Sequence, residues 1–313
     1  MSAVGELASI VSKRTKTPGV KEKHPDNRPA MIFMTPWILG LLGITLIPMV
    51  ASFALAFTDY SLLAAPNFVG LENVERMWND TRLHNSLIVT FIYVFVGTPL
   101  QLAVALALAV VLNQGVKGLS FYRSVFYLPS LIGGSVAIAI LWRQMFGTGG
   151  LVNQVLGVLG FEGMPGWISN PDTALGTLIL LHVWTFGSPM IIFLAGLRQI
   201  PAMYYEAASM DGASKWHQFW HVTIPLLTPI IFFNLVLQVI NAFQSFTQAF
   251  VVSGGTGGPS DSTMFYTLYL YQRGFAQFDM GYASAMAWLL LIIVAVFTAI
   301  NFVVSKYWVF YDD

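Results

Sequence analysis

Cysteine is absent from the 313 residues of the chain, and charged residues make up only 10% of it. Without cysteine the chain can form no disulfide bond, no thiolate metal site and no cysteine nucleophile. Soluble domains carry about a quarter charged residues, so a water-facing surface for a chain of this size could not be built from so few. Hydrophobic residues, by contrast, account for 56% of the sequence. This composition predicts a protein whose solvent is lipid.

A basic stripe in the body of the chain is also missing. The formal net charge is zero, and basic residues gather only in the amino-terminal tail. A nucleic-acid-binding protein would show such a stripe or patch. The acidic residues are scattered over predicted loops, no G-x-S-x-G sequence occurs, and no carboxylate stands at ligand spacing from His217 and His221. We therefore expect no nucleic-acid partner, no catalytic site and no metal site.

Long stretches with almost no charge follow one another along the sequence. A helix rises about 1.5 Å per residue and must cross about 30 Å of hydrocarbon, so about 20 apolar residues form one span. The first stretch follows a polar, basic tail (residues 1–30) and is too long for a signal peptide. We expect an all-α, polytopic membrane protein in which residues 31–313 carry about six transmembrane helices. These are predicted near residues 31–58, 86–112, 124–146, 174–197, 225–250 and 283–305.

The basic residues predict the orientation of these spans. Eleven of the fifteen Lys and Arg residues fall on one side when the tail, residues 113–123, residues 198–224 and the carboxyl end are placed together. By the positive-inside rule that side is cytoplasmic. Six spans then leave both termini in the cytoplasm.

The loop between the fourth and fifth predicted spans, residues 198–224, carries helix signals of its own. Good helix formers occupy residues 202–208 after Pro201, and Gly212 follows as a terminator. A second helical segment then leads towards Pro225, where the fifth span begins. These signals predict a short helix, a sharp turn and a second short helix on the cytoplasmic side.

The same loop resembles the "EAA" signature of membrane subunits of binding-protein-dependent ATP-binding-cassette (ABC) importers. Glu206-Ala207-Ala208 is followed by three residues and Gly212, and then by nine residues and Val222-Thr223-Ile224-Pro225. Val222 and Ile224 stand where Ile and Leu are usual. Further segments resemble the carbohydrate-uptake branch, related to the maltose and glycerol-3-phosphate transporter subunits. They are FVGLENV at 68–74, FYRSVFYLPSLIGG at 121–134, FLAGLRQIP at 193–201 and GGTGGPSDST at 254–263.

The resemblance implies a type I ABC importer permease fold in a bacterial or archaeal cell (inner) membrane. It implies no cofactor in this chain, and partners that comprise a second homologous permease, two ATPase subunits holding ATP and Mg, and an extracytoplasmic solute-binding protein. The implied contacts with the ATPase are Glu206, Ala207, Ala208, Asp211, Gly212 and Ala213. The residues alone leave a second interpretation, in which Glu206 and Gly212 only cap and terminate interfacial helices. The implied contacts with the binding protein are Gly254, Gly255, Gly257 and Gly258.

Polar residues recur along the predicted fifth span. These are Asn234, Gln238, Asn241, Ser245 and Gln248. On a continuous helix they would share one face about 80° wide, and an unpaired amide in hydrocarbon costs several kcal/mol. The face must therefore meet protein or water. It is either a seam of interhelical hydrogen bonds or the wall of a pathway whose amides bind a hydroxylated solute.

Two tryptophans in other spans bear on the solute. Trp184 and Trp288 could stack on sugar rings beside the polar face, or could be core residues. No Arg or Lys is predicted at mid-membrane depth to neutralise a phosphate. We therefore expect a mono- or oligosaccharide, with glycerol phosphate or a related polyol as the alternative. A secondary transporter would need intramembrane carboxylates, and a membrane-anchored enzyme would need a convergent ionisable cluster; neither is predicted.

Overall fold

The computed structural model describes residues 28–115, 118–161 and 163–310, so the predicted tail lies outside it apart from its last three residues. The chain divides into two compact units, one ending at Ala51 and the other beginning at Ser52. The first unit contains α2 (Arg28–Gly40), a π-helical segment (Leu41–Leu46) and the start of α3 (Ile47–Leu55). Large apolar side chains cover this unit and are exposed, as a lipid-facing helix requires.

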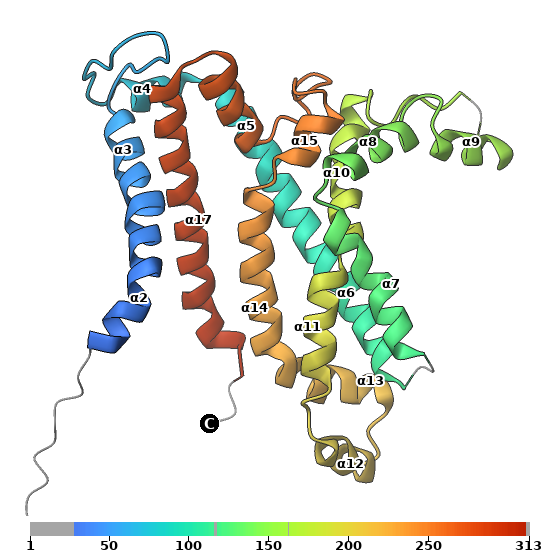
Figure 1. Ribbon diagram of the computed structural model, residues 1–313. Helices are drawn as coiled ribbons and strands as arrows, with labels where there is room; N and C mark the ends of the chain where they lie inside the picture. The colour runs from blue at the N-terminus through green and yellow to red at the C-terminus, as the bar shows by residue number, and fades with distance from the viewer. Residues whose placement is uncertain (1–27, 116–117, 162, 311–313) are drawn as a thin grey trace, which may run out of the picture. The chain divides into compact units, whose positions relative to one another are not determined.

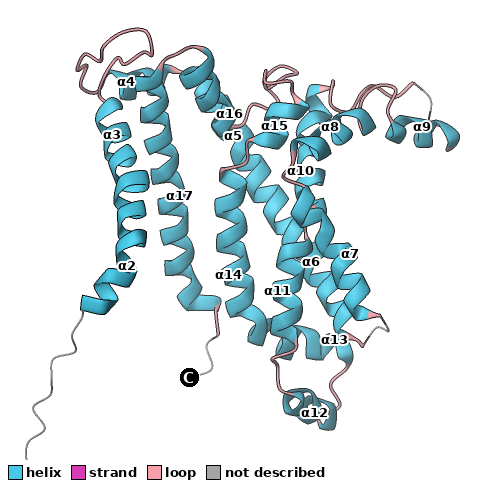
Figure 2. Ribbon diagram, in the orientation of Figure 1, coloured by secondary structure: helices cyan, strands magenta, loops and turns pink. Residues whose placement is uncertain are grey.

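Helices also make up the second unit, which has no β-strand among its described residues, only isolated β-bridges (Figures 1 and 2). Figure 1 shows α12 and α13 at one end of this unit and α4, α8 and α9 at the opposite end. The helices in chain order are α4 (Glu72–Asn79), α5 (Thr81–Ile92), α6 (Thr98–Asn113), α7 (Leu119–Ile132), α8 (Val136–Met145), α9 (Leu151–Val158), α10 (Pro171–Trp184), α11 (Gly187–Leu197), α12 (Ala202–Met210), α13 (Lys215–Gln218), α14 (Ile224–Phe243), α15 (Thr247–Val252), α16 (Tyr266–Tyr271) and α17 (Met280–Trp308). Further π-helical segments are Tyr93–Gly97, Phe219–Thr223 and Gln272–Ala276.

Four helical stretches of the described chain are long and apolar enough to cross a membrane. They are Met31–Leu55, Thr81–Asn113, Lys215–Val252 and Met280–Trp308. Two further helix pairs meet the same criteria but are bent, α7 and α8 by 95° and α10 and α11 by 41°. When each pair counts as one span, the total is six. The predicted all-α membrane fold with about six spans is confirmed.

Two clusters of buried apolar side chains hold the second unit together. The larger contains the fully buried Phe265, Tyr266 and Tyr269 of the α16 region together with Tyr282 of α17. The smaller joins α6, α11 and α14, where a Cβ atom on Gly196 would come within 2.1 Å of the Ile230 side chain. Within lipid the hydrophobic effect does not drive apolar helices together. Spans associate through van der Waals packing instead, and close backbone approach of this kind increases it.

Candidate functional site

The loop of residues 198–224 folds as predicted into a short helix, a sharp turn and a second short helix. Helix α12 ends at Met210, and Gly212 follows in the left-handed region with a φ of 78°. The Gly212 amide donates to the Ser209 carbonyl at 3.1 Å, and the Ala213 amide donates to the Ala208 carbonyl at 2.9 Å. These two bonds form a Schellman motif, which satisfies the last carbonyls of the helix. A side chain at Gly212 would be strained by its φ alone.

Gln218 fastens the two helices of this loop to each other. Its side chain is buried, and Nε2 donates to Ser209 Oγ at 2.9 Å and to the Ala213 carbonyl at 3.1 Å. On the far side of the loop, the hydroxyls of Tyr205 and Thr223 lie 3.0 Å apart. The loop is therefore a fixed unit that continues into α14 through a π-helical turn. Nothing in the sequence pattern singled out Gln218.

The residues predicted to contact an ATPase lie on the accessible side of this unit. Glu206, Ala207, Asp211 and Gly212 are exposed, while Ala208 and Ala213 are half-buried. Large apolar side chains are exposed around them, including Met210 and Trp216, with 89% and 71% of their surface accessible. Among the described residues Glu206 forms no ion pair. A projecting carboxylate inside an exposed apolar surface is typical of a protein-binding site.

The third and fourth spans are both interrupted, and the two breaks touch. Between α7 and α8 lie Gly133 and Ser135, and Ser135 Oγ accepts a hydrogen bond from the Ile138 amide in the first turn of α8 at 3.3 Å. A Cβ atom on Gly133 would lie 2.3 Å from Thr185 Cγ2, at the break between α10 and α11. A Cβ atom on Gly187 would lie 2.3 Å from the Phe126 carbonyl of α7. Glycine therefore allows the two broken spans to approach backbone to backbone.

Side chains from the second and third spans satisfy the carbonyls that the second break frees. Gln101 of α6 is buried, and its Nε2 donates to the His182 carbonyl at 3.0 Å, the Thr185 carbonyl at 3.1 Å and Thr185 Oγ1 at 2.9 Å. Ser130 Oγ donates to the Thr185 carbonyl at 2.9 Å and accepts the Ser188 amide at 2.8 Å. Irregular backbone within a membrane persists only with such partners.

The fifth span is interrupted, whereas the sequence predicts a continuous helix there. Helix α14 ends at Phe243 and α15 begins at Thr247, so no single helical face carries all five predicted polar residues. The prediction of one continuous face is wrong beyond Phe243. The Ser245 carbonyl accepts the hydroxyl of Thr267 instead of continuing the helix. Gln248 Nε2 reaches the Gly133 carbonyl at 3.4 Å, which brings the fifth span to the two other breaks. We call Gln101, Ser130, Gly133, Thr185 and Gln248 the helix-break junction.

The three remaining polar residues of α14 differ in exposure. Asn234 is fully buried and donates to the Ile230 carbonyl at 3.2 Å, and its Oδ1 has no partner among the described residues. Gln238 is half-buried, and Asn241 is exposed. Neighbouring Leu237 on the same helix is also exposed. An exposed amide on a membrane span must be covered by another chain or by water, whereas Asn234 resembles a packing residue.

Both predicted tryptophans pack against other aromatic rings. The Trp184 ring centroid lies 6.1 Å from that of Trp142, and the Trp288 centroid lies 4.8 Å from that of Phe53 in an edge-to-face arrangement. Both side chains remain half-buried. This geometry supports the packing interpretation of the two side chains more than sugar stacking.

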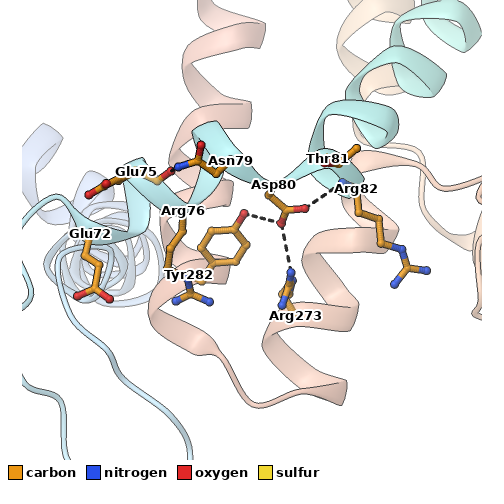
Figure 3. Close-up of a pocket in the computed structure, with 9 residues that line it drawn as sticks. All are labelled: Glu72, Glu75, Arg76, Asn79, Asp80, Thr81, Arg82, Arg273 and Tyr282. Carbon is orange, nitrogen blue, oxygen red and sulfur yellow. Dashed lines mark hydrogen bonds and ion pairs between the residues drawn. The ribbon is translucent and has the colours of Figure 1, made fainter.

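Acidic and basic side chains converge at the end of the unit opposite α12, contrary to the prediction that carboxylates are only scattered (Figure 3). Asp80 caps α5 and accepts hydrogen bonds from the hydroxyls of Tyr269 at 2.6 Å and Tyr282 at 2.8 Å. Arg273 Nη2 lies 3.2 Å from the same carboxylate oxygen. Partial burial opposes ionisation of Asp80, but these hydrogen bonds and Arg273 outweigh it and lower its pKa. Burial and the Asp80 carboxylate raise the pKa of Tyr269 to about 12.

Two more ion pairs complete this arginine–aspartate cluster. Arg82 binds both carboxylate oxygens of Asp261, at 2.9 and 2.8 Å, and Arg76 pairs with Asp279. The Arg76 guanidinium also lies 4.5 Å from the centre of the Tyr282 ring. Each of the three aspartates therefore has an arginine partner. The cluster joins α4, α5, α16 and α17, and a hollow of about 660 Å³ lies beside it.

The glycine-rich loop, residues 254–263, has a defined conformation that is held by its own hydrogen bonds. Gly254, Gly255 and Gly257 all have positive φ, and a Cβ atom on Gly257 would lie 2.3 Å from the Met264 side chain. Gly258 is held through its carbonyl, which accepts the Thr263 hydroxyl at 3.0 Å. Glycine is therefore required here by the backbone itself.

Comparison with known proteins decides the family. Residues 79–308 match the model of the binding-protein-dependent transport system inner membrane component family, which is most of the chain. The chain belongs to this family. The resemblance inferred from the EAA signature is therefore confirmed, and the protein is a multi-pass membrane permease.

Individual relatives of this family are similar to the chain over nearly its full length. The chain is 54% identical over 289 residues to the probable ABC transporter permease protein YesP of Bacillus subtilis, covering 92% of this chain and 94% of that protein. It is 32% identical to the lactose transport system permease protein LacF of Rhizobium radiobacter, covering 88% and 93% of the two chains. A chain of a bacterial alginate ABC transporter, solved with its alginate pentasaccharide-bound periplasmic protein, matches with a TM-score of 0.76 at 20% identity. That match covers 90% of this chain and 94% of the other, and it shows the shared fold.

In this permease, the sequence predicts the helices and turns that depend on neighbouring residues. It does not predict the side chains that bond residues far away in the chain. The helices and glycine turn of the EAA loop were predicted, as was the polarity of the fifth span. Gln101, Ser130 and Asp80 were not. Gln101 and Ser130 are the polar residues to look for in such cases, because each stands alone in an apolar stretch where an amide or hydroxyl must find a partner.

Proposed function

We propose that this permease subunit forms, with a second homologous permease, the pathway by which a sugar crosses the membrane. Two ATPase subunits holding ATP and Mg supply the energy, and an extracytoplasmic solute-binding protein delivers the sugar. The observation that carries the proposal is the exposed, internally braced EAA loop in a chain of this family. Relatives named for lactose, arabinooligosaccharides and trehalose/maltose support a mono- or oligosaccharide as the solute.

We assign the second half of α12 and the turn after it, residues 206–213, to the groove of an ATPase subunit. Glu206 offers a carboxylate without an ion pair in the described structure, and Met210 and Trp216 offer apolar surface to a partner. Gln218 makes the two loop helices move as one, and the second of them continues into α14. A displacement of α12 by the ATPase therefore tilts the fifth span directly.

We assign the solute pathway to the exposed side of α14 and to the helix-break junction. Asn241 and Gln238 are the accessible amides there, and their donors and acceptors match sugar hydroxyls. Ser245 and Gln248 belong to the junction side of the pathway, while Asn234, Trp184 and Trp288 support its wall through packing. Amide and hydroxyl groups form hydrogen bonds with the hydroxyls of a neutral solute, but they do not neutralise the charge of a phosphate. This favours a sugar over glycerol phosphate.

The proposed orientation places the EAA loop and both termini in the cytoplasm and the glycine-rich loop outside. Because the chain has no cysteine, single replacements report topology cleanly. We expect Ser214→Cys and Lys16→Cys to react with an impermeant maleimide only after the membrane is opened, and Thr256→Cys to react in intact cells or spheroplasts. Labelling of Ser214→Cys from outside would rule out docking of a cytoplasmic ATPase.

Uptake by the complete importer tests the function itself. The chain is expressed with its neighbouring permease, an ATPase and a binding protein, and the complex is purified and placed in proteoliposomes. We expect ATP-dependent accumulation of a mono- or oligosaccharide that requires the binding protein. Accumulation driven by an ion gradient through this chain alone would contradict the proposal. Uptake of glycerol phosphate in place of any sugar would keep the machinery and correct the solute.

A further inference from the structure

Two residues of the glycine-rich loop adopt a backbone conformation that only glycine takes up freely. Ser260 has a φ of 50° and Asp261 a φ of 57°. Aspartate tolerates this region better than most residues, but such positions persist mainly when surrounding contacts hold them. At Asp261 those contacts come from a distant part of the chain, at the start of the second span.

Helix α5 holds Asp261 at both its side chain and its backbone. Arg82 donates to both carboxylate oxygens, and Asn85 Nδ2 donates to the Asp261 carbonyl at 3.1 Å. Arg82 and Asn85 are three residues apart and so lie on one face of α5. A bidentate pair fixes orientation as well as distance. A displacement of the loop therefore acts directly on the first turn of α5.

Away from Asp261, the loop is held by hydrogen bonds of its own. The Thr263 amide donates to the Gly257 carbonyl at 3.0 Å, and the Gly257 amide donates to Ser253 Oγ at 3.0 Å. Gln272 Nε2 also donates to the Gly255 carbonyl at 2.7 Å. These bonds lie within residues 253–272 and do not involve α5. Removal of Arg82 would thus leave the loop folded and weaken its connection to the second span to the single bond from Asn85 to the Asp261 carbonyl.

We propose that the Arg82–Asp261 pair transmits engagement of the glycine-rich loop by the solute-binding protein to the second span. The far half of that span, α6, carries Gln101 and so reaches the helix-break junction. Arg82 and Asp261 are positioning residues, because they act through the loop and do not touch the solute. The inference rests on the proposed function, since it requires a binding protein that docks on this face.

The test uses the complete importer in lipid nanodiscs and measures ATP hydrolysis with and without the solute-loaded binding protein. The variants are Arg82→Gln, Asp261→Asn and the two combined; asparagine is chosen because it tolerates a positive φ. We expect basal hydrolysis to be unchanged and stimulation by the binding protein to fall about fivefold or more in each single variant. The combined variant should lose no more than either single one, because both remove the same link.

Arg76→Gln is the matched control, because Arg76 pairs with Asp279 in the same cluster without touching the loop. It should retain stimulation. Stimulation at the wild-type level in Arg82→Gln and Asp261→Asn would overturn the inference, as would equal losses in Arg76→Gln. A wild-type complex that ignores the binding protein would instead overturn the proposed function, and this outcome is visible before any variant is made.

A cross-link distinguishes transmission from a general defect. Arg82→Cys and Asp261→Cys are combined in this cysteine-free chain and joined by a short bifunctional methanethiosulfonate reagent. We expect the joined complex to regain stimulation and to lose it again on reduction, while the reagent leaves the wild-type complex unaffected. A joined complex that stays unresponsive would show that the connection between loop and span is not what the binding protein acts on.

Discussion

The EAA loop and the helix-break junction are both built around helix ends, but the partners of those ends come from different places. In the loop, the last carbonyls of α12 are satisfied by amides of the next few residues, Gly212 and Ala213. In the junction, the free carbonyls of His182 and Thr185 are satisfied by Gln101 and Ser130, which belong to other spans. The loop stands exposed, while the junction lies among packed helices.

This difference separates an element that can move as a block from an element that ties blocks together. A locally closed helix–turn–helix keeps its shape when a partner displaces it, so it can transfer force. A junction formed by residues of four spans changes when any of those spans shifts. The first suits a contact with an ATPase, and the second suits a site whose geometry must differ between inward-open and outward-open states.

The largest expected effect comes from breaking the turn of the EAA loop. Gly212→Pro replaces a φ of 78° by about −65° and removes the amide that bonds Ser209. We expect ATP-dependent uptake to fall about a hundredfold, the upper range of a coupling free energy of about 3 kcal/mol, with the protein still in the membrane. Glu206→Lys should act in the same way by reversing the exposed charge.

Gly212→Asn and Glu206→Gln serve as the matched variants. Asparagine enters the left-handed region at small cost, and glutamine keeps the shape and polarity of the side chain. Both should retain most of the uptake. Normal uptake in Gly212→Pro and Glu206→Lys, measured beside complexes of equal yield, would remove the EAA loop from the coupling role.

The second expected effect comes from opening the junction. Gln101→Leu removes three hydrogen bonds to the break of the fourth span, so the His182 carbonyl keeps only its bonds from Thr185 and the Thr185 carbonyl keeps only its bond from Ser130. Hydrogen bonds between membrane helices contribute about 0.6 to 1.7 kcal/mol each, so we expect uptake to fall about tenfold. Leu100→Ala, an exposed neighbour on α6, should leave uptake unchanged. Normal uptake by an intact complex that carries Gln101→Leu would show that the hydrogen bonds of Gln101 have no part in transport.

The two regions also show how far the sequence could be read. The EAA loop depends on residues that are neighbours in the chain, so Pro201, Gly212 and Pro225 were enough to predict it. The junction depends on Gln101 meeting Thr185 in space, which no local pattern records. The fifth span shows the same limit, because the spacing of Ser245 and Gln248 fits a helix that in fact ends at Phe243. Similarly, Asp80 and Arg273 meet only after folding.

A smaller effect is expected on the exposed side of α14. Asn241→Leu combined with Gln238→Leu removes accessible amides while keeping an apolar surface that a membrane span tolerates. We expect about a fivefold loss of transport rate or solute affinity, as for one neutral hydrogen bond of about 1 kcal/mol. Leu237→Ala on the same helix is the control and should transport normally. Unchanged affinity and rate in the double variant would reduce the two amides to packing residues.

The smallest effect is expected at Asp80, which combines a local role with a long-range one. It caps α5 and accepts hydrogen bonds from Tyr269 and Tyr282, so Asp80→Asn keeps the cap and weakens the ion pair with Arg273. A loss of about 1 kcal/mol of unfolding free energy should lower the thermal midpoint of the purified permease at neutral pH by about 2 to 4 °C. Glu72→Gln, which removes a carboxylate at the edge of the same hollow, should not change it.

Acid supplies the second measurement at this position. The folded state lowers the pKa of Asp80 below its ordinary value of 3.8, so ionised Asp80 stabilises the folded state. That contribution is complete at a pH above the unfolded pKa and is lost as the pH falls through the lower, folded pKa. The difference in thermal midpoint between wild type and Asp80→Asn should therefore shrink below a pH of about 4. A difference that stays constant into acid would show that the charge of Asp80 has no part in joining the spans, and that Asp80→Asn loses stability only through its altered hydrogen bonds with Tyr269 and Tyr282.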